Sequence, residues 1–100
     1  MVALVLTVPE HLRSALAAVA APLLDVRDGP ALLDTLECFL RANGSSSAVA
    51  RAMFVHRNTV GYRLGRVQEL TGRGVTSTAD RVVWTLALLA LGRTQLLDPL

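Results

Sequence analysis

Several residue types and patterns are scarce or missing in this chain of 100 residues, and the gaps narrow the classes of protein it can belong to. There is no lysine, so all ten basic residues are arginines. The single cysteine, Cys38, allows neither an internal disulfide bond nor a cysteine-based zinc site. No apolar run approaches the roughly 18 residues of a membrane-spanning helix, since the richest, Val82–Leu91, is about half that length. A cytoplasmic protein outside the membrane fits best.

Signatures of catalysis, metal binding and secretion are missing as well. Paired carboxylates, a Ser/His/Asp set and a glycine-rich phosphate loop do not occur at usable spacings, so we expect no enzyme. His11 and His56 lie far apart without a second ligand nearby, and we therefore expect no metal and no cofactor. Val2–Val8 is apolar and is the one stretch that hints at a strand, but no positive charge precedes it, which argues against a secretory signal.

The residues that are present favour one small folded domain with a positive middle third. Hydrophobic residues make up 52% of the chain and charged residues only 18%, which excludes a disordered tail. The middle third carries six arginines against one acid, Glu69, whereas the rest of the chain holds four arginines and seven acids. Such a positive field suits a polyanion, although on charge alone an arginine-rich solvated surface explains it equally well. The six are Arg41, Arg51, Arg57, Arg63, Arg66 and Arg73.

Turn and capping residues divide the chain into helical segments and predict an all-α fold of four to five helices. Pro9 suits the start of a first helix, which Pro22 should bend or end before Leu23. A turn over Asp25–Pro30 follows, and Asn43-Gly44 ends the next helix. The helices predicted after the first one are Ala31–Ala42, Ser47–Met53, Arg57–Leu70 and Ala79–Leu91.

The third and fourth of these helices have the spacing of a helix-turn-helix, around which the fold is built. The third is very short, and only Phe54-Val55-His56 separates it from the fourth. Ala50 provides the small side chain that lets the two helices cross closely, and Val60 can pack back against it. Ser45–Ser47 offer N-caps for the third helix, and either His56 or Asn58 offers one for the fourth. The pattern alone is moderately specific, because many αα-hairpins share it.

The fourth helix has an apolar side and a polar side. Val60, Leu64 and Val67 share one face at the i, i+4, i+7 spacing, which points that face to the core. Arginine can grip a guanine edge or a phosphate, asparagine can pair with adenine, and tyrosine can reach a phosphate oxygen. Two glycines would allow close approach to the bases, at about 1 kcal/mol each in helix propensity. The opposite side carries Asn58, Gly61, Tyr62, Gly65 and Arg66, and Arg57 and Arg63 flank the apolar stripe.

Residues near the turn are further candidates for contacts with DNA. His56 is expected first as a cap or turn residue, and Thr59 as a cap or a phosphate contact. Arg51 is as readily a surface charge as a phosphate contact, and the backbone amides of Ser46 and Ser47 suit a phosphate as well as a cap. The full predicted set is Ser46, Ser47, Arg51, His56, Arg57, Asn58, Thr59, Gly61, Tyr62, Arg63 and Arg66.

A set of short motifs spans most of the predicted helices: Leu32–Leu36 (LLDTL), Ser47–Ala50, Val55–Val60 (VHRNTV), Tyr62-Arg63-Leu64, Glu69–Gly72 and Asp80-Arg81. On these motifs the stretch Leu32–Leu91 resembles the C-terminal helix-turn-helix domain of the PucR/CdaR group of bacterial transcriptional regulators. This resemblance implies a DNA-binding domain that normally ends a longer regulator with an N-terminal sensor region. Gly61 and Gly65 depart from the family pattern, since those positions are often basic or polar in the family, and Phe54 stands where many helix-turn-helix units have glycine.

These observations define one expected function and one alternative. Residues 1–30 are assigned to an N-terminal helix and linker from a preceding region, and residues 31–100 to a helix-turn-helix DNA-binding domain. We expect sequence-specific binding of double-stranded DNA, with the helix Arg57–Leu70 in the major groove. Val82–Leu91 has no polar face, so we expect it to pack partly on the first helix and partly on a second copy, in a homodimer that can also use the N-terminal helix. The alternative is a helical dimerisation or protein-docking module without DNA affinity.

Overall fold

The computed structural model describes residues 9–98, and regular structure in this range is entirely helical. The all-α prediction is therefore confirmed for the described range, while Val2–Val8 lies outside it. In residues 9–98, no helix has the length and apolar character needed to span a membrane. The elements are α2 (Glu10–Leu24), α3 (Gly29–Arg41), α4 (Ser46–Met53), α5 (Arg57–Thr71), α6 (Thr78–Ala90) and a short 3₁₀ helix, η1 (Thr94–Leu97).

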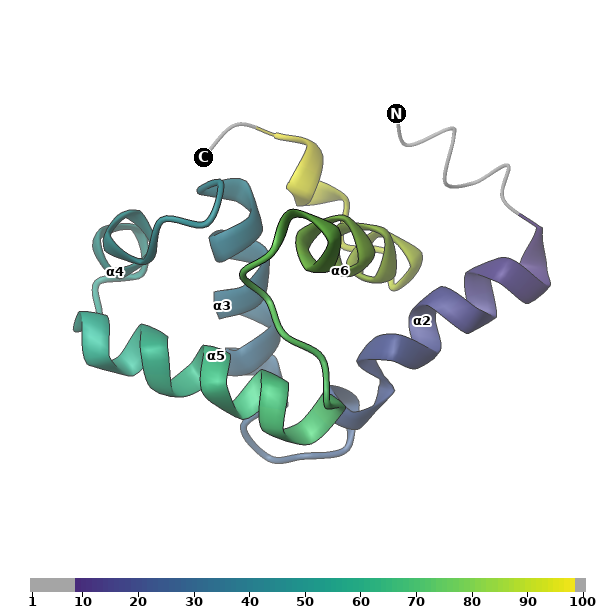
Figure 1. Cartoon of the computed structure of the whole chain (residues 1–100), viewed down its shortest axis with the longest axis horizontal. Helices are drawn as coiled ribbons and strands as arrows, with labels where there is room; N and C mark the ends of the chain where they lie inside the picture. Colours follow the sequence, from purple (N-terminus) through teal and green to yellow (C-terminus); the bar gives the residue numbers. More distant parts are fainter. Residues whose placement is uncertain (1–8, 99–100) are drawn as a thin grey trace.

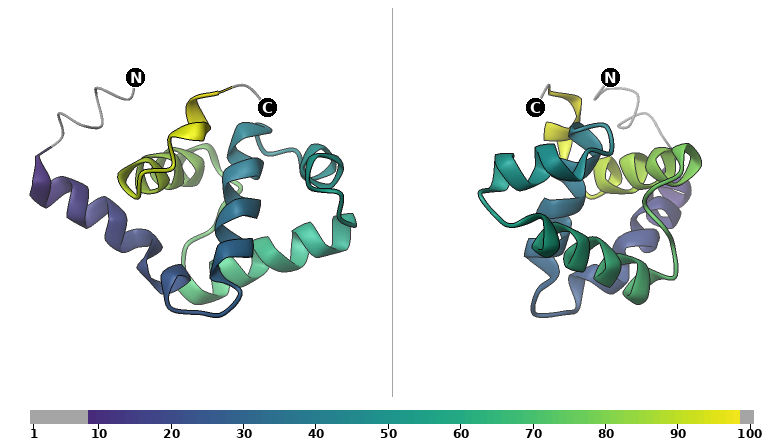
Figure 2. Two further views of the ribbon diagram at one scale, coloured as in Figure 1. Left: turned by 180° about the vertical axis from the view of Figure 1, so that it is seen from behind. Right: turned by 60° about the vertical axis from the view of Figure 1, so that its left-hand side comes forward.

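The helices form two groups that meet at α3. On one side of the molecule α4 and α5 pack on each other and on α3, and on the other side α2 packs along α6 (Figure 1). The end of α2 nearest α3 also contacts α5, whereas its beginning extends away from the other helices (Figure 2). The result is an elongated shape with extents of 39 × 28 × 23 Å, in which α4 and the start of α5 occupy one end.

The connection between α2 and α3 differs from the prediction in two respects. Pro22 does not end the first helix, which continues to Leu24. Pro22 lies in the last turn, where the loss of its N–H affects only one helical hydrogen bond, and burial of Leu23 stabilises that turn. The second helix begins at Gly29, two residues earlier than predicted. A side chain at Gly29 would overlap the backbone carbonyl of Leu23, so the close approach of α2 and α3 requires glycine.

One hydrophobic core joins the five α-helices of residues 9–98. Trp84 belongs to it and has no exposed surface, and its indole N–H donates a hydrogen bond to the backbone carbonyl of Gly74 at 3.0 Å. Ala20 and Leu23 of α2 belong to the same core, and the predicted domain boundary at residue 30 remains a prediction. The largest fully buried side chains are Trp84, Leu23, Leu32, Leu36, Leu88, Val49, Val60, Val67 and Thr35.

The last helix is only partly covered by the rest of the chain. Ala87, Leu88 and Leu89 are buried and α6 packs against α2, as the apolar pattern predicted. Val82 and Leu86, one helical turn apart, remain 53% and 42% exposed. The helix ends at Ala90 and the chain turns through Leu91 and Gly92 into η1.

Candidate nucleic-acid interface

Two capped ends and a three-residue turn position α4 against α5. Ser45 starts α4, since its hydroxyl accepts a hydrogen bond from the backbone N–H of Ala48 at 3.2 Å. At the other end Phe54 adopts the left-handed conformation, and the N–H of Val55 returns to the carbonyl of Ala50 at 3.1 Å. Ser46 and Ser47 are therefore the first residues of α4, and both are half-buried.

His56 caps α5 and leaves Asn58 free for other contacts. The imidazole Nδ1 of His56 accepts a hydrogen bond from the backbone N–H of Asn58 at 2.9 Å, which decides between the two predicted caps. In a neutral ring with Nδ1 as acceptor the proton is on Nε2, and His56 is exposed, so Nε2–H can donate to an outside acceptor. The side chain of Asn58 is exposed and has no hydrogen-bond partner within residues 9–98.

The inner side of α5 is as the sequence predicted, and the outer side is as predicted except at Arg66, which is half-buried and paired with Asp28. The inner side, Val60, Leu64 and Val67, is at most 8% exposed and packs into the core. The outer side, Asn58, Gly61, Tyr62 and Gly65, is exposed, with 66% of the surface of Tyr62 accessible. A methyl group added at Gly61 or Gly65 would meet no atom within 4 Å. Contacts within the described chain therefore do not explain why these helix positions are glycine.

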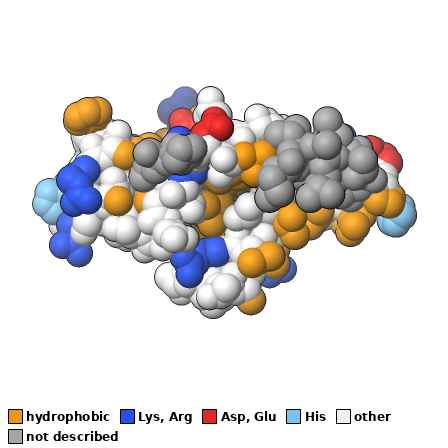
Figure 3. Space-filling model, turned by 90° about the horizontal axis from the view of Figure 1, so that it is seen from above, with side chains coloured by type: hydrophobic (Ala, Val, Ile, Leu, Met, Phe, Trp, Pro, Cys, Tyr) orange, Lys and Arg blue, Asp and Glu red, His pale blue; other side chains and the backbone are white. Residues whose placement is uncertain are grey.

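The arginines near this surface differ in how firmly the fold holds them. Arg51 on α4 and Arg57 at the start of α5 are exposed, and neither forms an ion pair with any residue from 9 to 98. Arg63 is half-buried and its guanidinium donates to the Thr35 hydroxyl of α3 at 3.3 Å. Figure 3 shows arginine and histidine side chains gathered at the end of the molecule formed by α4 and the first turns of α5.

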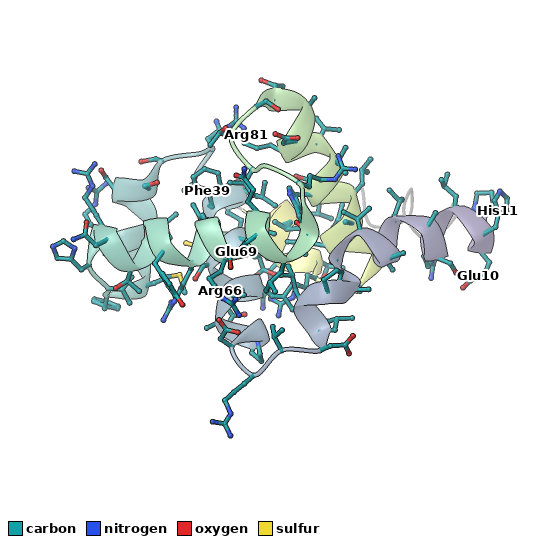
Figure 4. All side chains as sticks on the ribbon, turned by 60° about the horizontal axis from the view of Figure 1, so that its bottom comes forward. Glu10, His11, Phe39, Arg66, Glu69 and Arg81 are labelled. Carbon is teal, nitrogen blue, oxygen red and sulfur yellow. The ribbon has the colours of Figure 1, made fainter. Side chains whose placement is uncertain are left out.

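Arg66 has a partner within the fold that the sequence pattern did not predict. Its guanidinium donates two hydrogen bonds, of 3.2 and 3.1 Å, to the carboxylate of Asp28 in the connection between α2 and α3. These bonds hold the pKa of Asp28 below its ordinary value near 3.8 and raise the pKa of Arg66. Figure 4 shows Arg66 beside Glu69 on α5. Glu69 is the one acid on this helix and is exposed near its C-terminal end, so the outer side of the first turns is free of negative charge.

The exposed side chains at the start of α5 are positive or neutral hydrogen-bonding groups. In the part of the chain that the structure describes, no three His, Cys, Asp or Glu residues come together in a group that could hold a metal ion. A short capped helix, a three-residue turn and a second helix with one buried and one exposed side define a helix-turn-helix domain.

Comparison with known proteins identifies the particular family. A family model described as the PucR C-terminal helix-turn-helix domain matches residues 32–90. The chain belongs to this family, which confirms the resemblance stated from its sequence motifs. No solved structure matches the chain.

The curated relatives are much longer than this chain. An uncharacterized protein of Mycobacterium tuberculosis is 45% identical over 69 residues, which cover 69% of this chain and 16% of that protein. The carbohydrate diacid regulator of Escherichia coli is 43% identical over 54 residues, or 54% of this chain and 14% of the regulator. The transcriptional activator PmfR of Paenarthrobacter nicotinovorans is 41% identical over 59 residues, or 59% of this chain and 13% of the activator. The chain thus spans less than a fifth of each.

Proposed function

We propose that this domain binds double-stranded DNA in a sequence-specific manner, with the N-terminal half of α5 in the major groove. The observation that carries the proposal is the division of α5 into two sides. Val60, Leu64 and Val67 fix the helix to the core, so Asn58 and Tyr62 face outward. A major groove admits an α-helix, and its base edges are read by side chains of this kind.

Each group in the proposed interface has a chemical role. Arg51, Arg57 and the Nε2–H of His56 suit phosphate oxygens, as do the free backbone amides at the start of α4, at Ser46 and Ser47. Asn58 is the strongest candidate for reading a base, because a carboxamide pairs with an adenine edge through two hydrogen bonds.

The remaining predicted residues support or border this interface. Tyr62 and Thr59 can reach phosphate oxygens, and Gly61 allows the helix backbone to approach the groove. Arg63 and Arg66 are assigned to the edge of the footprint, where their hydrogen bonds to Thr35 and Asp28 restrict their reach.

We further propose that this domain is the output domain of a bacterial transcriptional regulator. Two relatives named as a regulator and a transcriptional activator support this role. The domain would determine which DNA site the regulator binds, since phosphate contacts position a protein on DNA and base contacts give the sequence preference.

We also propose that two copies pair through α6. Val82 and Leu86 are exposed apolar side chains on this helix, and with Leu40 they line a cleft of about 310 Å³. The beginning of α2, where Leu12 is 46% exposed, can extend the same contact. Two-fold dimers bind half-sites about 34 Å apart. Light scattering after size exclusion tests the pairing, and a strict monomer at high concentration contradicts it.

Selection of bound sequences from a random duplex pool tests the proposed function. We expect an enriched motif, and binding to it should weaken with salt at a log–log slope of about −0.9 for each phosphate neutralised. Enrichment of no motif, with weak salt-sensitive binding to all duplexes, would leave DNA binding without specificity. Absence of any duplex binding at low salt would favour the alternative, a helical module that docks on protein.

A further inference from the structure

Phe54 stands out among the residues that adopt a left-handed backbone conformation. Among residues 9–98 five residues have positive φ, and four of them are Gly44, Gly72, Gly92 and Asn43. The fifth is Phe54, with φ 57° and ψ 44°. A side chain with a Cβ atom is strained in this conformation, and glycine or asparagine avoids much of the strain. Folding alone would therefore favour glycine at position 54.

The side chain of Phe54 is also almost fully surrounded by water. It is 94% exposed, compared with 66% for Tyr62 and 55% for Leu24, so its ring adds almost nothing to the core. Neither the local backbone nor the packing of the described chain accounts for a phenylalanine here. A contact with another molecule is the remaining physical reason for an apolar ring at this position.

The surroundings of Phe54 indicate which molecule that is. Arg51, His56 and Arg57 are exposed close to it in sequence, and no acid occurs between Glu37 and Glu69. Cations on both sides of the ring would attract phosphates, and the turn leads directly into the end of α5 that is proposed to enter the groove. Near the major groove, DNA offers apolar surface in its deoxyribose rings and in the C5-methyl group of thymine.

We propose that the Phe54 ring packs on deoxyribose or thymine methyl groups of the bound duplex, beside the bases contacted by α5. This inference rests on the proposed function. It assigns to the turn an apolar contact in addition to the polar contacts of the helix. The left-handed backbone at position 54 directs the side chain away from the core, which leaves the whole ring available for that contact.

The variant Phe54→Gly tests the inference because it should change folding and binding in opposite directions. Relief of backbone strain should raise Tm by about 4–8 °C, the shift typical of a modest stabilisation in a domain of this size. Affinity for the selected duplex, measured by fluorescence anisotropy, should fall about tenfold, as expected for losing one buried ring. Asn43→Gly is the control: it also places glycine at a left-handed residue, but away from the turn, so it should leave affinity unchanged and raise Tm less, because asparagine is less strained there than phenylalanine.

Duplexes with deoxyuridine in place of thymine divide the possible contacts. If the unsubstituted protein binds the deoxyuridine duplex more weakly than the thymine duplex, and Phe54→Gly binds both equally, the ring packs on a thymine methyl group. Equal binding of both duplexes, with the tenfold deficit of the variant retained, places it on deoxyribose. Either result supports the inference.

Two results would overturn it. One is a Phe54→Gly protein with undiminished affinity. The other is a Phe54→Gly protein that is monomeric in light scattering while the unsubstituted protein is dimeric, which would place the ring against a second protein copy. If the unsubstituted protein binds no duplex, the proposed function itself fails, and that is seen before any variant is compared.

Discussion

The inner side of α5 and its outer side differ in what they contribute to the folded domain. Val60, Leu64 and Val67 on the inner side are buried and tie the helix to the core. On the outer side, Gly61 and Gly65 lower helix propensity with no packing reason, and Tyr62 exposes two thirds of its surface. The residues of one side stabilise the fold, and those of the other side are unfavourable or neutral for it. This division is the basis of the proposal that α5 presents its outer side to a partner.

Substitutions on the two sides should therefore have different consequences. Inner-side changes should reduce stability and DNA binding together, because binding requires the folded helix. Outer-side changes should reduce binding while stability stays constant or rises. The following variants test this difference, from the largest expected effect to the smallest.

Leu64→Ala should destabilise the domain by about 2–5 kcal/mol, because it removes a buried side chain and leaves a cavity. This is a large part of the roughly 5–15 kcal/mol that keeps a domain folded, so duplex binding should decline with it. Urea unfolding followed by Trp84 fluorescence measures the change. Leu64→Met, which preserves volume, should cost less than about 1.5 kcal/mol and retain binding. Full stability in Leu64→Ala would contradict the burial of this side of the helix.

Asn58→Ala should reduce discrimination between the selected duplex and a scrambled one by about 1–3 kcal/mol, if the carboxamide pairs with a base. The free energy of unfolding should be almost unchanged, because His56 rather than Asn58 provides the cap. Competition anisotropy with both duplexes measures the effect, and Gln68→Ala, exposed farther along α5, is the matched control. Equal losses on both duplexes would instead identify Asn58 as a phosphate contact.

Gly61→Ala should stabilise the domain by about 1 kcal/mol, since alanine has the higher helix propensity and its methyl group meets no atom within 4 Å. Affinity for the selected duplex should fall at the same time, because the methyl group keeps the backbone from the groove. Gly72→Ala has equally open space but a φ of 72°, so it should lower Tm and leave binding unchanged. Thermal unfolding and anisotropy of the two variants distinguish the roles. A Gly61→Ala protein that binds as tightly as before would show that close approach is not required there.

The pair between Asp28 and Arg66 should give the smallest effect, which depends on pH. The pKa of Asp28 is lowered in the folded state, so its stabilising contribution is present above about pH 4 and is lost as pH falls through the lowered value. The difference in unfolding free energy between the unsubstituted protein and Asp28→Asn should therefore be constant near neutral pH and shrink towards pH 3. Urea titrations across this range measure it. A difference that persists at pH 3 would mean that the ion pair is not its source.

The parts of the fold that follow from local patterns could be predicted from the sequence. The helices, the helix-turn-helix and the inner side of α5 all depend on spacings within one segment, such as the i, i+4, i+7 spacing of Val60, Leu64 and Val67. For the N-terminal caps of α4 and α5, the sequence provided candidate residues but did not decide among them. The choice between His56 and Asn58 depended on side-chain geometry that the sequence does not specify.

The features that depend on distant residues could not be predicted in this way. Arg66 shares the helical face of the candidate DNA contacts, but its partner Asp28 lies 38 residues earlier and is brought near only by the packing of α2 and α3. The same packing explains why Gly29 begins a helix and why Pro22 is tolerated inside one. The exposure of Phe54 could not be predicted either, because an apolar residue in a turn is usually expected to be partly covered.

An NMR titration of the isotopically labelled domain with its selected duplex tests the central claim most directly. The account predicts that amide signals change most at the start of α4, in the turn around Phe54 and on Asn58, Gly61 and Tyr62, while those of Ala87 and Leu88 on α6 change little. Changes concentrated on α2 and α6, with the first turns of α5 unaffected, would contradict it.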